Sequence, residues 1–222
     1  MRMRLMTTRI AALATSLIMA GCSNAAGPSP EQSRTYRLGF SATSPVLTVE
    51  SVLATIDAWA PCADVALVTH TVPWRALLAD TSASFLIRRD LFELVNLYRS
   101  RSLPLVVQLD VTDGLARERE APELVTLGRS VTEVAVQDVY RQYVLAVDSI
   151  LAPEYLGLAM EVNLVRAAAP AAVYDAVVTI ANRAADDLAV QGSGARLFVS
   201  FQVETAWGRL GGSGSYIGID RE

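Results

Sequence analysis

The chain has 222 residues, of which 52% are hydrophobic and 19% are charged, and its formal net charge is -4. This length suits one large domain or two small ones, and the composition is that of a chain that forms a core, which excludes a disordered protein. The negative balance provides no basic surface of the kind that nucleic-acid binding requires, so we expect no nucleic-acid partner.

Residues 1–21 predict a signal peptide. Three Arg side chains precede the apolar-dominated stretch IAALATSLIMA, which is too short to span a bilayer but fits the core of a signal peptide. The residues Met19-Ala20-Gly21-Cys22 resemble the lipobox of bacterial lipoproteins. The resemblance implies that Cys22 becomes the lipid-modified, palmitate-bearing N-terminus, held at a membrane surface on the periplasmic or extracellular face of the cell envelope. The alternative is an ordinary signal peptide with an unrelated cysteine.

Residues 22–33 are expected to form a flexible, lipid-anchored tether, because SNAAGPSPEQ is small, polar and proline-containing. The folded domain is then expected at residues 34–222. Cys62 has no second cysteine in that domain, so we expect a buried thiol and no disulfide.

The domain shows strands that alternate with helices. Apolar runs predict strands at 35–43, 64–72, 103–111, 155–165 and 196–204, and helical spacing of apolar residues predicts helices at 46–59, 84–101, 131–150 and 170–189. A polar loop, TDGLAREREAPE, follows the third strand. This alternation predicts an α/β fold with a parallel sheet.

Polar side chains near the strand ends favour a TIM-like (β/α)8 barrel over an open doubly wound sheet. The third predicted strand carries Gln108 and Asp110, the fourth carries Glu161 and Asn163, and the fifth carries Ser200, Gln202 and Glu204. Each set has i, i+2 spacing, which places its members on one side of a strand. Barrels direct such residues to the carboxyl-terminal mouth, where their active sites lie.

Four stretches, YRLGFSAT, LPLVVQLDV, YLGLAMEVNLV and LFVSFQVETAWG, resemble clan-A glycoside hydrolases, in particular endo-β-1,4-galactanase-like barrels. The resemblance implies that Glu161 is the catalytic acid/base. From their positions near the strand ends, we expect Asn163, Gln202 and Glu204 to contact substrate. Met160 stands where the clan has Asn, and the clan's nucleophile lies on a seventh strand. With five predicted strands, we expect the barrel to be incomplete in this chain.

Three further residues are candidates for substrate binding. His70 lies near the end of the second predicted strand, and Trp74 follows that strand, where its ring could stack on a sugar. Asp110 lies near the end of the third predicted strand. A lone histidine is a poor metal ligand signal, and phosphate-binding or nucleotide-binding motifs do not occur, so we expect no metal and no cofactor.

These patterns predict a cell-envelope lipoprotein with a glycoside-hydrolase-like domain that hydrolyses a polysaccharide in its complete form. A close pair of Glu161 and Glu204 would be needed for two-carboxylate catalysis within this chain. The alternatives are a surface lipoprotein that binds glycan or another envelope component without catalysis, and a truncated, inactive product. The expected partners are the membrane, through Cys22, and a polysaccharide or oligosaccharide.

Overall fold

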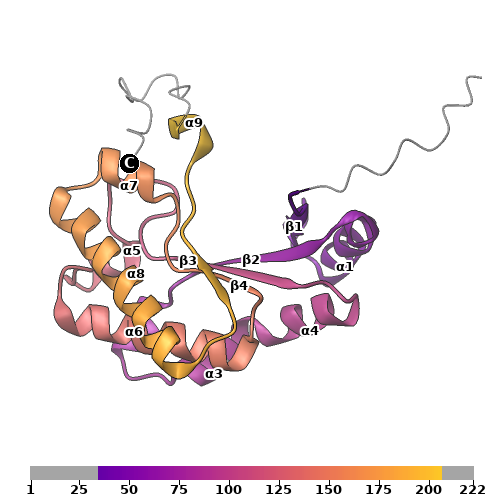
Figure 1. Cartoon of the computed structure of the whole chain (residues 1–222), viewed down its shortest axis with the longest axis horizontal. Coiled ribbons are helices and arrows are strands. Elements are labelled where there is room, and N and C mark those ends of the chain that lie inside the picture. Colours follow the sequence, from indigo (N-terminus) through magenta and orange to yellow (C-terminus); the bar gives the residue numbers. More distant parts are fainter. Residues whose placement is uncertain (1–34, 207–222) are drawn as a thin grey trace, which may run out of the picture. The chain divides into compact units, whose positions relative to one another are not determined.

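A computed structural model describes residues 35–206, in which strands alternate with helices (Figure 1). The strands are β1 (Gly39–Ser41), β2 (Val65–Thr71), β3 (Leu105–Asp110), β4 (Tyr155–Gly157) and β5 (Arg196–Phe198). The helices are α1 (Val49–Trp59), the 3-10 turn η1 (Ala60–Cys62), α2 (Trp74–Leu78), α3 (Ala83–Asp90), α4 (Phe92–Ser100), α5 (Pro122–Thr126), α6 (Val134–Leu151), α7 (Val162–Ala168), α8 (Ala171–Gln191) and α9 (Val203–Ala206).

The five strands form one parallel sheet in the order β1-β2-β3-β4-β5. Each strand therefore pairs with its neighbour in sequence. A doubly wound sheet reverses its strand order at a switch point, whereas a (β/α) barrel adds its strands in sequence. The fold is α/β as predicted, and its strand order is that of a barrel segment.

Helices cover one face of this sheet, as Figure 1 shows for α3, α4, α6 and α8. The register places Val68 beside Val107 and Val107 beside Leu156 on this covered face, and all three are buried. The next position along each strand points the other way. There Thr69 is exposed, whereas Gln108 and Gly157 are buried, and Gly157 lies against the Phe198 ring. An open sheet with helices on both sides would bury both faces, so the one-sided cover also fits a barrel segment.

The uncovered face is concave. The guanidinium carbon Cζ of Arg37, two residues before β1, lies 5.6 Å from the centre of the Tyr155 ring on β4. A flat sheet would hold β1 and β4 about 14 Å apart, and a side-chain contact over the two strands between them fits a sheet that curves toward this side, as the inner face of a barrel segment does. We call it the concave face, and its members include Ser41, Leu67, Thr69, Val106, Gln108, Tyr155, Gly157, Arg196 and Phe198.

The two long helices have the apolar spacing that packs a helix on a sheet. On α6 the fully buried residues are Val136, Tyr140, Tyr143, Val144, Val147 and Leu151, and on α8 they are Val177, Ile180, Ala184 and Leu188. Helix α8 ends at Gly192, whose φ of 77° is the left-handed conformation that glycine adopts without strain. The chain then turns into β5, and every predicted helix and strand has a counterpart.

Two predicted strands extend too far. The fourth ends at Gly157 and not at 165, because the apolar residues that follow it turn the chain and then form α7. Glu161 is the residue before α7, in the left-handed conformation with a φ of 47°, and Asn163 lies within α7. The fifth ends at Phe198, and Glu204 lies on α9. The i, i+2 strand argument for Glu161 with Asn163, and for Gln202 with Glu204, is therefore wrong.

Two smaller predictions are corrected as well. The helix predicted at 84–101 is two helices, because the chain bends at Leu91 between α3 and α4. Cys62 is exposed at the end of η1 and not buried. Across residues 35–206, each helix is too short or too polar to cross a membrane. The predicted leader, the tether and the lipid-modified Cys22 lie outside the described residues.

Candidate functional site at the carboxyl end of the sheet

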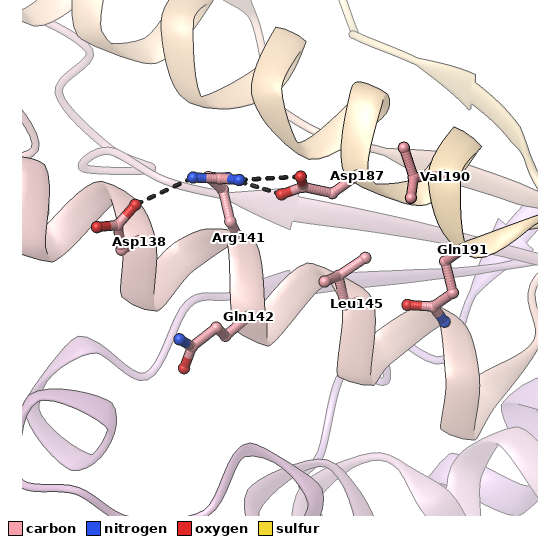
Figure 2. A pocket seen from close by; sticks show the side chains of 7 residues that line it. All are labelled: Asp138, Arg141, Gln142, Leu145, Asp187, Val190 and Gln191. Atoms are coloured by element: carbon pink, nitrogen blue, oxygen red, sulfur yellow. Dashed lines mark hydrogen bonds and ion pairs between the residues drawn. The ribbon is translucent and has the colours of Figure 1, made fainter.

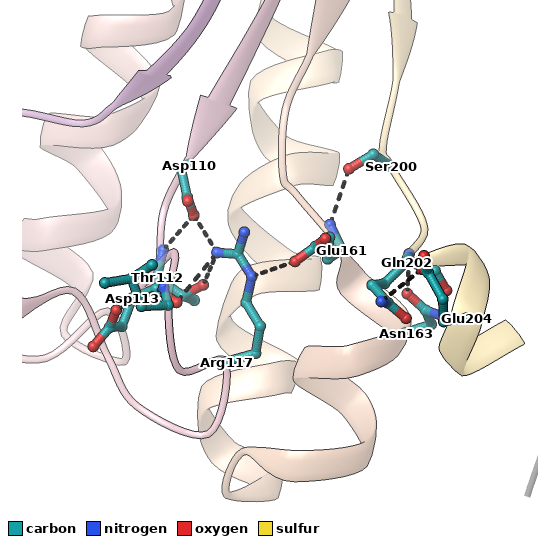
Figure 3. Close-up of polar contacts among 10 residues, drawn as sticks. Asp110, Thr112, Asp113, Arg117, Glu161, Asn163, Ser200, Gln202 and Glu204 are labelled. Carbon is teal, nitrogen blue, oxygen red and sulfur yellow. Dashed lines mark hydrogen bonds and ion pairs between the residues drawn. The ribbon is translucent and has the colours of Figure 1, made fainter. Parts of the chain in front are cut away.

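Three connections meet at the carboxyl end of the sheet (Figure 3). The loop after β3 runs through residues 111–121, the turn after β4 leads through Glu161 into α7, and the segment after β5 leads through Ser200 and Gln202 into α9. Parallel strands bring their carboxyl ends to one edge, so side chains far apart in the sequence become neighbours there.

Arg117 is the centre of this edge. Its Nε donates to Glu161 Oε2 at 2.9 Å, and its Nη1 donates to Asp110 Oδ1 at 2.6 Å and to Thr112 Oγ1 at 3.0 Å. Nη1 also lies 3.4 Å from the backbone oxygen of Asp113. We call Asp110, Thr112, Arg117 and Glu161 the carboxyl-end network. It joins the end of β3, the loop that follows it and the start of α7.

The network is deeply buried on one side and open on the other. The Arg117 and Asp110 side chains are 4% and 7% exposed, whereas Glu161 is 31% exposed. Burial by itself lowers the pKa of Arg117, but the hydrogen bonds to Asp110 and Glu161 outweigh it, so that its pKa is raised. Arg117 therefore stays charged, and its charge is balanced by the buried Asp110 carboxylate and the partly exposed Glu161 carboxylate.

The loop has its own supports, which hold Arg117 in place. Asp113 accepts the backbone N–H of Leu115 at 2.9 Å and pairs with Arg119 at 3.2 Å. Gly114 is close to the network, since a Cβ built there would lie 2.9 Å from Asp110 Oδ2. A side chain at this position would push against the Asp110 carboxylate.

A second group of polar contacts continues from Glu161 toward α9. Ser200 Oγ accepts the backbone N–H of Glu161 at 3.0 Å, which holds that residue in its left-handed conformation. Asn163 makes a reciprocal pair with the backbone of Gln202, donating to its oxygen at 2.9 Å and accepting from its nitrogen at 2.8 Å. The Gln202 side chain donates to Glu204 Oε2 at 2.7 Å.

The structure thus brings five of the predicted site residues together, although by a different route from the one predicted. Asp110 comes from a strand, Glu161 and Asn163 from a turn and a helix, and Gln202 and Glu204 from the last segment (Figure 3). Glu161 points toward Arg117, and Glu204 lies apart from it beside Gln202 (Figure 3). The hypothetical pair of Glu161 and Glu204 is therefore not formed.

Two predicted residues lie elsewhere. Trp74 begins α2 and is 0% exposed, with its ring 6.0 Å from that of Tyr140. Because Pro73 leads directly into a helix that packs on the core, the predicted sugar-stacking ring is wrong. His70 lies on the helix-covered face of β2, 6.2 Å from the Tyr143 ring, and burial lowers its pKa against an opposing effect of Asp90.

Sequence reasoning missed Arg117, the residue that organises the site. The stretch ARERE places it among several charged residues of a loop, and its partner Glu161 is 44 residues away. The polar character of the loop after a strand was the only available signal. In the described part of the chain, no group of three or more His, Cys, Asp or Glu side chains is arranged to hold a metal ion.

A separate polar groove lies between α6 and α8 and has a volume of about 470 Å³ (Figure 2). Arg141 crosses it, donating to both oxygens of Asp187 at 2.7 and 2.9 Å and to Asp138 at 3.1 Å. These bonds raise the pKa of Arg141, chiefly through Asp187. Two carboxylates neutralise the charge of the Arg141 guanidinium. We therefore interpret this cluster as a structural contact that holds α6 against α8 and not as a ligand site.

No protein-family model matches the chain, and no curated protein matches it. One solved structure that is similar is the D-allulose 3-epimerase from Methylomonas sp. in complex with D-allulose, at 16% identity and a TM-score of 0.39. The match covers 73% of this chain and 51% of the epimerase, so this chain spans about half of that protein. The likeness is too distant to support a function, and it does not point to clan-A glycoside hydrolases.

Proposed function

We propose that the chain is a cell-envelope lipoprotein, anchored through a lipid on Cys22, whose β/α domain binds a carbohydrate without hydrolysing it. The carboxyl end of the sheet is where folds of this kind bind their ligands. The anchor is supported by the sequence Met19-Ala20-Gly21-Cys22 alone. The binding function is supported by the chemistry of the edge itself.

Sugar hydroxyls are recognised by planar polar side chains that both donate and accept hydrogen bonds. The edge carries the partly exposed Glu161 carboxylate, which is bonded to Arg117, and the amide residues Asn163 and Gln202, which are hydrogen-bonded to each other. Below it on the concave face lie Gln108 and the ring of Phe198, which covers Gly157. An aromatic ring beside amide and carboxylate groups suits the apolar C–H face and polar rim of a sugar.

The arrangement around Arg117 is the observation that carries the preference for binding over hydrolysis. Nε and Nη1 of a guanidinium point in different directions, so Glu161 and Asp110 lie on different sides of Arg117. A retaining glycosidase needs two carboxyl groups about 5–5.5 Å apart that flank the scissile bond. Here a buried, permanently charged side chain separates the carboxylates.

Hydrolysis by a clan-A type of mechanism is the second candidate, favoured by the position of Glu161 after β4 at the carboxyl edge. The two functions are separated by measuring saccharide binding and the release of reducing ends in the same samples. We expect saturable binding of at least one oligosaccharide from an envelope-polysaccharide panel, without release of reducing ends. Release that disappears in Glu161→Gln would establish the hydrolase.

Glu118→Gln is the matched control for Glu161→Gln. Glu118 lies on the loop of Arg117, its carboxylate is 56% exposed, and its ion pair with Arg119 is long at 4.0 Å. Losing a charge-assisted hydrogen bond to a ligand costs about 1.5–3 kcal/mol, so Glu161→Gln should weaken binding roughly tenfold or more. Glu118→Gln should leave it unchanged.

The anchor has a separate test, the intact mass of the protein extracted from its native membrane fraction. We expect the mass of a chain beginning at Cys22 plus the acyl groups. A mass with an unmodified Cys22 would exclude the lipoprotein assignment while leaving the binding assignment to be decided by the saccharide measurement.

A further inference from the structure

Two arginine side chains approach one tyrosine ring on the concave face, at the opposite end of the sheet from the carboxyl-end network. Cζ of Arg37 and Cζ of Arg196 each lie 5.6 Å from the centre of the Tyr155 ring. Nη1 of Arg196 is also 3.3 Å from the Tyr155 hydroxyl oxygen. Tyr155 and Arg196 are the first residues of β4 and β5, and Arg37 precedes β1 by two residues.

The positions of these residues in the sheet explain why they converge. The register pairs Tyr155 with Arg196, which places both side chains on the same face. Arg37 is two residues before Gly39, which pairs with Val65 on the concave face, so an extended chain directs Arg37 to that face too. The curvature of the sheet then brings guanidinium groups from its two edges to one aromatic ring.

Neither guanidinium has a carboxylate partner among residues 35–206, and both side chains are exposed. Asp64 and Glu154 accept hydrogen bonds from backbone N–H groups. Asp64 accepts the N–H of Leu38 at 2.7 Å, and Glu154 accepts the N–H of Leu105. Arg117 and Arg141 differ, because each has two carboxylate partners.

Two like charges beside one ring repel each other unless an anion joins them. The Tyr155 ring attracts each cation only weakly at an exposed position, by about 0.5–1 kcal/mol, and adds no negative charge. A phosphate group carries a charge of about -1.5 to -2 at neutral pH and has three acceptor oxygens. It therefore matches two guanidinium groups in charge and in hydrogen-bonding capacity.

We propose that Arg37, Arg196 and Tyr155 form a binding site for a phosphate group. Exposed arginine side chains can turn toward a common ligand, and the Tyr155 ring limits the space in which they do so. The phosphate could belong to a soluble phosphomonoester or to a phospholipid headgroup, whose phosphodiester has one negative charge and two free oxygens. In both cases the guanidinium groups would bind phosphate oxygens. The site does not depend on the proposed carbohydrate function.

The test uses the full chain carrying Cys22→Ser, which removes lipidation, at low ionic strength. Inorganic phosphate is titrated by calorimetry, and vesicles of phosphatidylglycerol are compared with vesicles of phosphatidylcholine by sedimentation. We expect phosphate to bind, and Arg37→Gln and Arg196→Gln each to weaken it at least tenfold. Arg183→Gln is the control, because Arg183 is an exposed residue of α8 that changes the net charge equally.

Vesicle binding identifies the source of the phosphate. Preferential binding to phosphatidylglycerol vesicles that is lost in Arg37→Gln and Arg196→Gln would identify the ligand as a phospholipid headgroup. Binding of inorganic phosphate without preferential vesicle binding would identify the ligand as a soluble phosphorylated compound. The proposal is overturned if the full chain binds neither probe, or if Arg183→Gln weakens binding as much as the two site variants. Thermal melts that match the wild type establish that each variant is folded.

Discussion

Replacing Arg117 by Met tests whether the carboxyl-end network holds the three connections together. The substitution leaves Asp110, which is 7% exposed, as a buried carboxylate without its cation. Removing one partner of a buried ion pair costs about 3–5 kcal/mol, whereas a pair at the surface contributes about 0–1 kcal/mol. Because Glu161 is 31% exposed, most of the loss should come from Asp110.

We therefore expect Arg117→Met to lower the free energy of unfolding by about 3–5 kcal/mol, and Glu161→Gln to lower it by less than about 1 kcal/mol. Combining Arg117→Met with Asp110→Asn should recover part of the loss, because the buried charge is then removed. Arg117→Lys keeps the positive charge but lacks the planar set of guanidinium donors. Its loss of stability should therefore lie between that of Glu161→Gln and that of Arg117→Met. Urea unfolding at pH 7 measures all four variants.

The reasoning is refuted if Arg117→Met unfolds within 1 kcal/mol of the wild type, or if Glu161→Gln is as damaging as Arg117→Met. The first result would mean that Asp110 is not effectively buried. The second would mean that the exposed half of the network carries the stability. A total stability of about 5–15 kcal/mol leaves room to measure the single variants.

Three further predictions concern residues away from this edge. Burial lowers the pKa of His70, so as the pH falls below about 6.5 the imidazole takes up a proton in the unfolded chain before it does so in the folded chain. The free energy of unfolding should therefore fall with pH in this range, by up to ~1.4 kcal/mol per pH unit. His70→Phe should remove this pH dependence, as measured by urea unfolding. Gly157→Ala places a Cβ 2.8 Å from the Phe198 ring and should cost about 1–3 kcal/mol in thermal melts; a neutral result would mean that the ring moves freely. Tyr140→Phe removes a buried hydrogen bond to a backbone oxygen and should lower the free energy of unfolding by about 1–3 kcal/mol. Tyr143→Phe removes a hydroxyl that has no partner in residues 35–206 and should change stability little. Equal losses in the two variants would contradict the assignment of these hydrogen-bond partners.

The strands and long helices could be predicted because their apolar periodicity is local. The ends of β4 and β5 could not, since the residues between Gly157 and α7 are as apolar as a strand. The turn at Glu161 depends on a left-handed conformation that is unusual outside glycine, and its support, the Ser200 hydroxyl, is 39 residues away. A contact of this kind leaves no pattern in the sequence.

The candidate site was partly predictable for a related reason. The carboxyl-end rule for β/α folds identifies Asp110 and Glu161 without any knowledge of their contacts. It cannot identify Arg117, because a loop can place any of its charged residues inward. The same rule wrongly placed Trp74 at the open carboxyl end. Pro73 ends the strand but also begins a helix that packs into the core, and Trp74 is buried there.

The central claim is that the carboxyl end of the sheet binds a saccharide without cleaving it, and one experiment tests it most directly. The native, membrane-extracted protein is titrated with the oligosaccharide panel while reducing ends are assayed in the same samples, for the wild type, Glu161→Gln and Glu118→Gln. The account predicts saturable binding that Glu161→Gln weakens about tenfold and Glu118→Gln does not, with no reducing ends released. Turnover that Glu161→Gln abolishes, or no binding to any saccharide of the panel, would contradict it.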